Sequence, residues 1–325
     1  MVTFRIATTC VRSSCKKVAA GFGLFAAFML TAFPAFANTS LIVDTELHDW
    51  LERYTQPLLK EAGLADESVR FHIASGSDIN AFATESRDIV IYAGLINRAD
   101  NAAEVIGVLA HEIGHIKGRH HFKIYNELSK VRAPAIISGI LGTLAMAAGQ
   151  GHAGAALITG GQAAATSHLL RFNRLQENEA DQTAASLMQE EGYPLDGLAS
   201  FFEKLRNDEI LYFKRPPAYL MTHPLSDNRM SAMQERVQQA PSPTVDLNNE
   251  WFKRIQAKVY AYNNTPAATL RKYLKTDTLE AQYARAIAYF LNGELDKSLD
   301  ALERLKGTAA DDVYLKDIEG QVYLT

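Results

Sequence analysis

Hydrophobic residues recur at helical spacing along most of the chain and in strand-like runs over only a short part of it. Helical spacing, with capping and stop residues, predicts helices over residues 38–62, 101–118, 172–191, 226–237, 270–274, 281–292, 295–305 and 311–324. Runs rich in β-branched residues predict strands over residues 69–73 and 88–93, with 79–83 as a third strand between them. The pattern therefore indicates a mainly α protein of the α+β type, with a small sheet ahead of most of the helices.

The predicted helix 101–118 carries His-Glu-x-x-His on an apolar background. His111 and His115 are four residues apart, so they lie on one side of the helix and can direct two imidazoles at one point. Zinc binds neutral imidazole nitrogen, and catalytic zinc sites combine three protein ligands with a water. Glu112 would then stand beside that water as a general base. The alternative is a pair of surface histidines with a solvated glutamate, but the apolar surroundings favour zinc.

Two residues compete as the third zinc ligand. With Gly118, His121 completes a longer pattern in which a glycine turn returns a third histidine to the metal. In the predicted helix 172–191, Glu177 and Asp181 lie four residues apart, and a nearby cation would explain two like charges at that spacing. Glu177 would bind zinc, and Asp181 would accept a hydrogen bond from the far nitrogen of a ligating histidine. Taken alone, Glu177 and Asp181 are more simply explained as a solvated acidic face balanced by arginines. The residues by themselves therefore do not decide which side chain is the third zinc ligand.

No charged residue occurs between Arg132 and Arg171, where Ala, Gly, Ile and Leu predominate. Glycines near the middle divide residues 133–170 into two apolar halves, each shorter than the ~20 residues that a membrane-spanning helix requires. A water-soluble protein rarely exposes so much apolar surface. We therefore predict a helical hairpin that covers the site or touches a membrane surface. A buried pair of core helices is the second possibility, and a transmembrane hairpin is the third.

The first 37 residues have the features of a secretory leader. A basic start precedes an apolar run and an Ala-x-Ala cleavage pattern, which places the mature N-terminus at Asn38. Cys10 and Cys15, the two cysteines of the chain, both fall in this leader. The leader also holds four of the 33 basic residues and none of the 37 acidic ones, so the remainder has a formal charge of −8. Such an acidic exported protein is a poor candidate for nucleic-acid binding, and we expect a bacterial periplasmic location.

Four motifs follow one another along the chain: Asn80-Ala81-Phe82-Ala83, His111-Glu112-x-x-His115, Glu177-x-x-Ala180-Asp181, and Thr222-His223-Pro224 with Arg229. Their combination resembles the gluzincin family of zinc metallopeptidases that includes the CAAX prenyl protease, most closely its periplasmic branch of β-barrel assembly-enhancing proteases. The resemblance extends over nearly all of the chain after the leader. It implies one Zn²⁺ per chain, bound by His111, His115 and Glu177, with Glu112 as the catalytic base.

The resemblance also implies roles for residues around these ligands. Asp181 and Arg229 would support the ligands from behind, and residues 80–83 would form an edge strand that binds the substrate. His223 would lie near the metal, either to hydrogen-bond the tetrahedral intermediate or to act as a latch in the open metal position. Gly118 departs from the family pattern, and it is this residue that creates the competing pattern ending in a third histidine.

The domain organisation predicted from the sequence has four parts: the leader 1–37, a metalloprotease domain 38–240, a Pro-containing linker 241–250, and a helical region 251–325 that resembles tetratricopeptide repeats. A solenoid normally needs more repeats than this region contains. We therefore expect the array to be incomplete or to present a surface for a partner.

The resemblance implies a zinc-dependent endopeptidase of the bacterial periplasm that degrades misfolded or misassembled outer-membrane proteins. The alternative is a chaperone-like assembly factor whose metal site is mostly latched by His223. The expected partners are unfolded polypeptides and, through the helical repeats, the outer-membrane protein assembly machinery. Residues 133–170 add an expected contact with a membrane surface.

Overall fold

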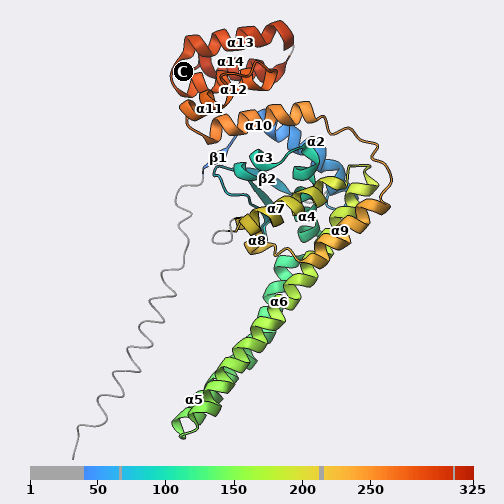
Figure 1. Cartoon of the computed structure of the whole chain (residues 1–325), viewed down its shortest axis with the longest axis vertical. Helices are drawn as coiled ribbons and strands as arrows, with labels where there is room; N and C mark the ends of the chain where they lie inside the picture. The colour runs from blue at the N-terminus through green and yellow to red at the C-terminus, as the bar shows by residue number, and fades with distance from the viewer. Residues whose placement is uncertain (1–39, 66–67, 212–215, 310–311) are drawn as a thin grey trace, which may run out of the picture. The chain divides into compact units, whose positions relative to one another are not determined.

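The computed structural model describes residues 40–65, 68–211, 216–309 and 312–325, so the predicted leader lies outside the described residues. The described chain is mainly helical with one small sheet, which confirms the predicted fold class (Figure 1). Its helices are α2 (Thr45–Glu61), α3 (Ala93–Arg98), α4 (Ala102–Lys117), α5 (His120–Ala147), α6 (Gly151–Glu190), α7 (Asp196–Leu211), α8 (Ala218–Thr222), α9 (Asp227–Gln239), α10 (Asn249–Asn263), α11 (Pro266–Tyr273), α12 (Leu279–Leu291), α13 (Leu295–Ala309) and α14 (Val313–Tyr323).

The sheet has four strands in the order β1-β2-β4-β3. They are β1 (Leu41–Ile42), β2 (Arg70–Ala74), β3 (Ala81–Ala83) and β4 (Asp88–Tyr92). β2 and β4 are parallel, with His72 opposite Val90, and β3 runs antiparallel to β4, with Phe82 opposite Val90. The third predicted strand is thus β3, and it forms one edge of the sheet.

The first helix begins later than the sequence predicted. Leu41 and Ile42 pair with β2 as β1, and Asp44 then caps α2 by accepting a hydrogen bond from the Leu47 N–H at 3.1 Å. The helical spacing of the following apolar residues gave no sign of the short strand, because two residues are too few to show alternation.

The predicted helix 172–191 is also not a separate element. It is the second part of α6, which runs unbroken from Gly151 to Glu190. No glycine or proline occurs between Gly161 and Gly192 to interrupt it, and the stretch is rich in alanine and other helix-forming residues. The third ligand candidate Glu177 and the apolar hairpin therefore share one helix.

α4 runs through the main hydrophobic core, and every residue from Ala102 to Ile116 is buried. Its N-terminus is capped by Asn101, whose side-chain oxygen accepts a hydrogen bond from the Glu104 N–H at 3.1 Å. Neighbouring helices approach its backbone at two glycines. A Cβ at Gly107 would lie 2.9 Å from Leu198 Cβ in α7, and one at Gly114 would lie 2.9 Å from the Ala180 carbonyl oxygen in α6.

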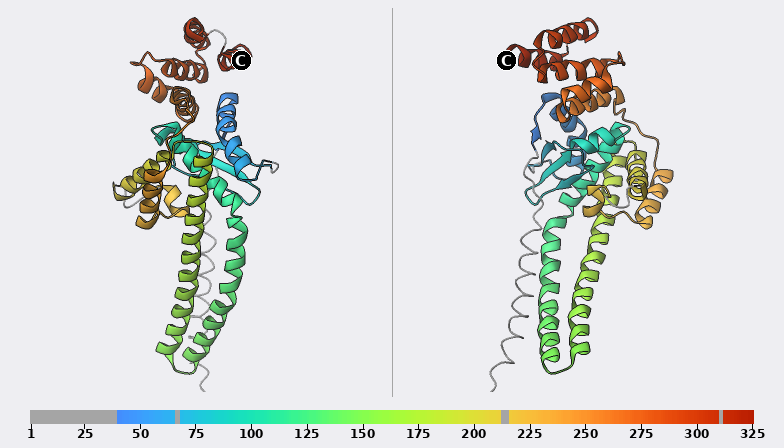
Figure 2. Two further views of the ribbon diagram at one scale, coloured as in Figure 1. Left: turned by 90° about the vertical axis from the view of Figure 1, so that its right-hand side faces the viewer. Right: turned by 60° about the vertical axis from the view of Figure 1, so that its left-hand side comes forward.

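α10 contributes to two hydrophobic cores. Phe252, Ile255 and Val259 belong to the main core, whereas Ala257 and Ala261 belong to a second core formed with α12, α13 and α14. The helical region that resembled tetratricopeptide repeats thus shares a helix with the rest of the described chain. Figure 2 shows α10 between the last helices and the sheet-containing part.

A buried charge cluster links α10 to the start of α2. Lys258 lies 2.8 Å from Asp44 and 3.0 Å from Glu46, and all three side chains are at most 1% exposed. Arg254 also pairs with Glu46. Removing one member of a buried ion pair leaves an uncompensated charge in the interior, which is strongly destabilising.

We therefore expect Lys258→Met to lower the free energy of unfolding by about 3 kcal/mol. The matched control is Lys253→Met on the same helix, where an exposed pair with Glu250 is lost, and its expected effect is ~0.5 kcal/mol. Urea unfolding of the two variants and the unsubstituted protein measures both values. Equal losses for the two substitutions would show that the buried cluster does not hold α10 in place.

Candidate metal centre

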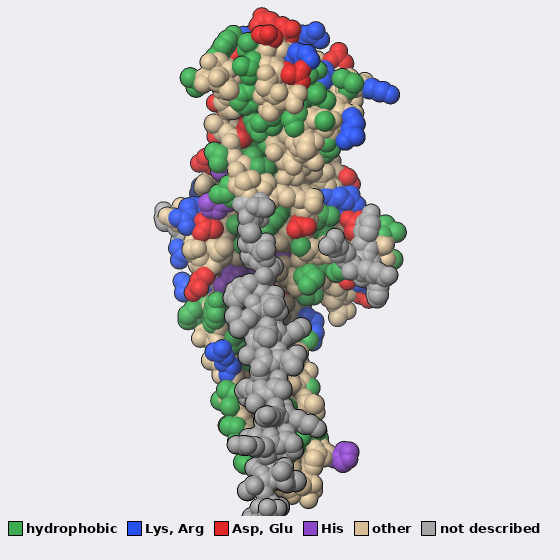
Figure 3. All heavy atoms as spheres, turned by 90° about the vertical axis from the view of Figure 1, so that its left-hand side faces the viewer, with side chains coloured by type: hydrophobic (Ala, Val, Ile, Leu, Met, Phe, Trp, Pro, Cys, Tyr) green, Lys and Arg blue, Asp and Glu red, His purple; other side chains and the backbone are tan. Residues whose placement is uncertain are grey.

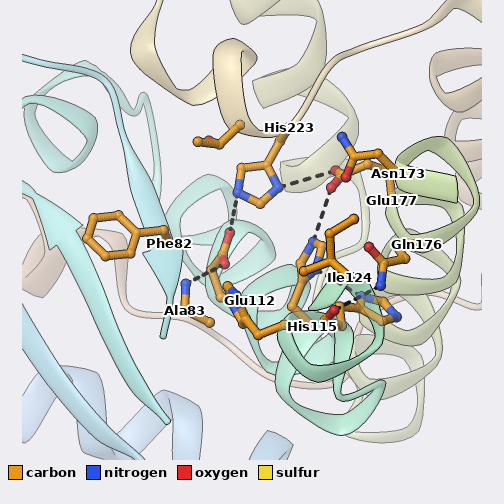
Figure 4. A pocket seen from close by; sticks show the side chains of 12 residues that line it. Phe82, Ala83, Glu112, His115, Ile124, Asn173, Gln176, Glu177 and His223 are labelled. Atoms are coloured by element: carbon orange, nitrogen blue, oxygen red, sulfur yellow. Dashed lines mark hydrogen bonds and ion pairs between the residues drawn. The ribbon is translucent and has the colours of Figure 1, made fainter. Parts of the chain in front are cut away.

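Four buried side chains from three segments meet at one point. His111 and His115 come from α4, Glu177 from α6, and His223 from the residue that follows α8. One ligand atom from each lies within 4.8 Å of the other three. Figure 4 shows Glu177 and His223 pointing toward each other across the pocket, with His115 below them.

Most of the distances between these side chains are close to those of a tetrahedral metal site. Ligand atoms at roughly 2.1 Å from a tetrahedral zinc are roughly 3.4 Å apart. His111 Nε2 lies 3.0 Å from His115 Nε2, 3.3 Å from His223 Nδ1 and 3.4 Å from Glu177 Oε2. Glu177 also lies 3.2 Å from His223 Nδ1 through Oε2, and its other oxygen, Oε1, lies 3.4 Å from His115 Nε2. Three imidazole nitrogens and a carboxylate at these distances fit zinc.

The electrostatics of the site also fit a cation. Burial disfavours charge on His111, but hydrogen bonds to Asp181 and Glu177 outweigh it and raise the pKa of this histidine to about 9. Burial likewise disfavours charge on Glu177, yet hydrogen bonds from His111 and His223 hold its pKa well below the ordinary value. The cluster thus stabilises positive charge at the point where the four ligand atoms meet. A divalent metal would supply that charge directly.

Asp181 lies behind His111, one helical turn after Glu177. Its Oδ1 is 2.9 Å from His111 Nδ1, which leaves Nε2 of the same ring directed at the cluster. Arg229 of α9 donates two hydrogen bonds to Asp181, at 2.6 and 2.8 Å, and its Nη1 lies 3.0 Å from Glu177. The structure therefore brings together the residues that the resemblance placed behind the ligands, and Arg229 touches both carboxylates.

His120 is a residue of the site that the sequence did not reveal. It is 3% exposed, and its Nδ1 lies 2.9 Å from His115 Nδ1. Its Nε2 lies 3.2 Å from Glu179. If His115 uses Nε2 for a metal, its Nδ1–H donates to His120, whose own Nε2–H then faces Glu179. Burial lowers the pKa of both rings, which keeps them neutral and suits this order of donors and acceptors.

Gly118 explains how the His120 ring fits. A Cβ at position 118 would lie 2.3 Å from His120 Nε2, so any larger residue would displace the ring. The following residue, Arg119, has a left-handed backbone with φ 50°, which turns the chain from α4 into α5. Gly118 therefore makes room for a histidine that packs behind His115. In the sequence, only the nearby Gly118 and the five-residue spacing from His115 could have indicated this buried position of His120.

His121 lies outside the four-residue cluster. It lines a cavity of about 280 Å³ beside the cluster, together with Phe82, Glu112 and Glu177. The geometry therefore favours Glu177 over His121 as the third ligand. His72 of β2 is half-buried and lies 2.8 Å from Asp88, outside the cluster.

Glu112 lies between the edge strand and the cluster (Figure 4). Its Oε2 accepts a hydrogen bond from the Ala83 N–H at 2.9 Å. Its Oε1 has no hydrogen-bond partner among the described residues and lies 3.5 Å from His223 Nε2. Burial raises the pKa of this carboxyl group, which makes Glu112 a stronger base than a solvated glutamate.

The strand β3 supplies the remaining predicted residues. Ala81 and Ala83 are buried, while Phe82 is half-buried and lines the same cavity as Glu112. The side-chain oxygen of Asn80 is buried without a hydrogen-bond partner in the described part of the chain. Buried polar atoms without a partner are uncommon, so this one marks the segment just before β3 as a candidate for substrate contact.

The fold and the four-residue cluster, which could hold a metal ion, fit the class of zinc metallopeptidases. The chain belongs to peptidase family M48, whose model matches residues 45–237, and the resemblance inferred from the sequence is thereby confirmed.

Curated relatives include the β-barrel assembly-enhancing proteases of Yersinia pestis, 28% identical over 87% of this chain, and of Escherichia coli K12, 27% identical over 88% of it. The metalloprotease LoiP of Escherichia coli is 31% identical over 53% of this chain and 64% of its own length. The aligned regions cover 59% and 60% of the two assembly-enhancing proteases.

We expect His120→Ala to weaken zinc binding about 10- to 100-fold, because it removes the partner of the far nitrogen of His115. Competition with a chromogenic chelator measures the affinity. The neighbouring His121→Ala is the control, with an expected change of less than about twofold, as His121 lies outside the cluster. Loss of zinc from the control variant would instead identify His121 as a ligand.

Proposed function

We propose that this chain is a zinc-dependent endopeptidase of the bacterial periplasm that degrades misfolded or misassembled outer-membrane proteins. The observation that carries the peptidase activity is the convergence of His111, His115 and Glu177 on one point with the free oxygen of Glu112 beside it. The predicted leader supports export. The substrate class follows from the similarity to assembly-enhancing proteases over most of this chain.

Peptide hydrolysis needs a base, an acid and a means of holding the substrate. Zinc bound by the cluster would polarise the peptide carbonyl and lower the pKa of water to about 7. Glu112 would take the proton of the attacking water at Oε1, the oxygen without a hydrogen-bond partner, and return it to the leaving amine. Asp181 would keep the His111 ring oriented throughout, because its other carboxylate oxygen is fixed by Arg229.

The substrate would bind as an extended strand along β3. Among the described residues no strand pairs with the outer side of β3, so its edge can take up a peptide. Phe82 would contact a substrate side chain in the cavity, and Asn80 would hydrogen-bond the peptide through its unsatisfied side-chain oxygen. A substrate strand on this edge would pass beside Glu112, which already contacts the Ala83 N–H.

We further propose that His223 is a latch, meaning a residue that fills the fourth metal position in a resting state. Its Nδ1 stands at the fourth corner of the ligand set, where a catalytic site keeps room for water. The ring stacks on Tyr219 with centroids 4.5 Å apart, and the Tyr219 N–H donates to the Ile79 carbonyl oxygen just before β3. A substrate entering along this edge would disturb the segment that positions His223.

This latch also favours the second candidate function, a chaperone-like assembly factor whose peptidase is mostly silent. The helices α11 to α14 would provide its binding surface for the outer-membrane assembly machinery. These helices pack on one another through a shared core, and the buried Ser298 of α13 donates to the Ala286 carbonyl oxygen of α12 at 2.8 Å. The two candidate functions differ in whether activity requires Glu112.

Replacing the base tests the peptidase. Glu112→Gln should lower the cleavage rate of an unfolded test protein on the order of 10³-fold while zinc stays bound, because the amide cannot accept the proton. Gel-based cleavage assays and metal analysis of the same samples measure the two quantities. If Glu112→Gln retains zinc and cleaves as fast as the unsubstituted protein, Glu112 is not the base and the proposed mechanism is wrong.

Replacing the latch distinguishes its two possible roles. If His223 fills the fourth position, His223→Ala should raise the cleavage rate severalfold and weaken zinc binding by about tenfold, since one of four ligands is lost. If it instead assists the reaction, the rate should fall with little change in zinc affinity. The same cleavage and chelator-competition assays separate the two results.

A further inference from the structure

The hairpin of α5 and α6 has the reverse of the usual distribution of side chains. In α5 the buried residues are His120 and Gly142, and in the part of α6 before residue 176 the buried residue is Gly154. The large apolar side chains are instead exposed: Ile136, Ile137, Ile140, Leu141, Leu144, Met146, Leu157 and Leu170 are each between 44% and 61% exposed. A helix pair built for water would bury these residues and expose the small ones.

Small residues hold the two helices together. A Cβ at Gly154 would lie 2.4 Å from the Gly142 carbonyl oxygen, and a Cβ at Gly161 would meet the Ser138 side chain. The two helices lie side by side in both views of Figure 2. Close packing through small residues, with large apolar residues facing outward, is typical of helix pairs surrounded by lipid.

The exposed apolar residues also surround α5 too widely for a protein groove. At 3.6 residues per turn, Ile136, Ile137, Leu141, Leu144 and Met146 spread over an arc of roughly 220°. A helix that docks on protein needs an apolar stripe of about 100°. Whatever covers these apolar residues must therefore contact most of the circumference of α5. A lipid bilayer does so, whereas a second copy of the chain would cover only one side.

Charge and length fix how far the hairpin would enter a bilayer. The uncharged stretch ends at Arg132 and Arg171, with Lys130 and Arg174 nearby and Glu127 as the acidic neighbour. Basic residues at this place suit anionic headgroups. The uncharged part of the hairpin is roughly 22 Å long in α5 (residues 133–147) and roughly 30 Å in α6 (residues 151–170). Both lengths exceed one leaflet of ~15 Å, and neither exceeds the ~30 Å of the whole hydrocarbon core. α5 as a whole is long and apolar enough to cross a membrane by composition.

We infer that the hairpin inserts into a phospholipid bilayer from one side, up to the basic residues at its base, without crossing it. In Figure 3 the visible lower part of the molecule carries hydrophobic side chains and few charged ones, in keeping with this orientation. Glu177 follows Arg171 by six residues, or about 9 Å along α6. The metal cluster then stands just above the headgroups. This position also bears on the substrates, an inference that rests on the proposed function: they are polypeptide segments exposed at the membrane surface.

The test is flotation with vesicles of phosphatidylethanolamine and phosphatidylglycerol, using protein purified from the periplasm of producing cells. Leu144→Asp should weaken vesicle binding on the order of 100-fold, because a carboxylate near the bilayer centre is costly. Leu274→Asp in the C-terminal helices is the matched control, since both leucines are 61% exposed, and it should bind as the unsubstituted protein does. Equal binding of both variants, or no binding by the unsubstituted protein, overturns the inference.

A second measurement reports depth. A tryptophan introduced by Leu144→Trp should be quenched most by lipids brominated deep in the acyl chains, and one introduced by Ala133→Trp by lipids brominated near the headgroup. The signal of the two native tryptophans is subtracted. Absence of quenching at position 144, or a dimer that Leu144→Asp dissociates in sedimentation, overturns the inference. Both measurements are repeated with Glu112→Gln and without substrate. Neither measurement depends on peptide cleavage, so the membrane inference is tested independently of the proposed peptidase activity.

Discussion

The close approach of α4 and α6 at Gly114 and Ala180 is the constraint on which the site depends. Two histidines on one helix supply half of a tetrahedral set, and the remaining ligands have to come from elsewhere in the fold. With only a hydrogen atom at position 114, the α6 backbone comes near enough for Glu177 and Asp181 to reach opposite sides of the same histidine. Arg229 pairs with both of these buried carboxylates and compensates part of their negative charge. This pairing lowers the cost of burying the two acidic residues between the helices.

Two kinds of support surround the ligands. Behind His111 stands a carboxylate held by an arginine, and behind His115 stands a neutral histidine held near Glu179. Asp181 places a full negative charge next to the His111 ring, whereas the neutral His120 places none next to the His115 ring. The two histidines therefore differ in basicity even though they belong to one motif, and as zinc ligands His111 would be the stronger electron donor.

The sequence predicted those parts of the structure that depend on local spacing. The helix with His111 and His115 and the strand at 79–83 follow from periodicity, capping chemistry and short motifs, whereas the edge position of that strand was implied by the family resemblance. Contacts between distant segments were beyond this reasoning. The buried position of His120 depends on how α5 leaves α4, and the fourth corner taken by His223 depends on where α8 lies, so the sequence left two roles open for it. The length of α6 was missed because a change from apolar to charged composition resembled the start of a new helix.

The sharing of α10 between two hydrophobic cores has a consequence for folding. Phe252 and Ile255 face one core while Ala257 and Ala261 face the other, so neither core is complete without this helix. Loss of the last helices would strip one side of α10, and loss of α10 would open the core that contains α4. The region that holds the four-residue cluster and the C-terminal helices are therefore thermodynamically coupled, and residues 40–325 should melt in one cooperative transition rather than as two independent modules.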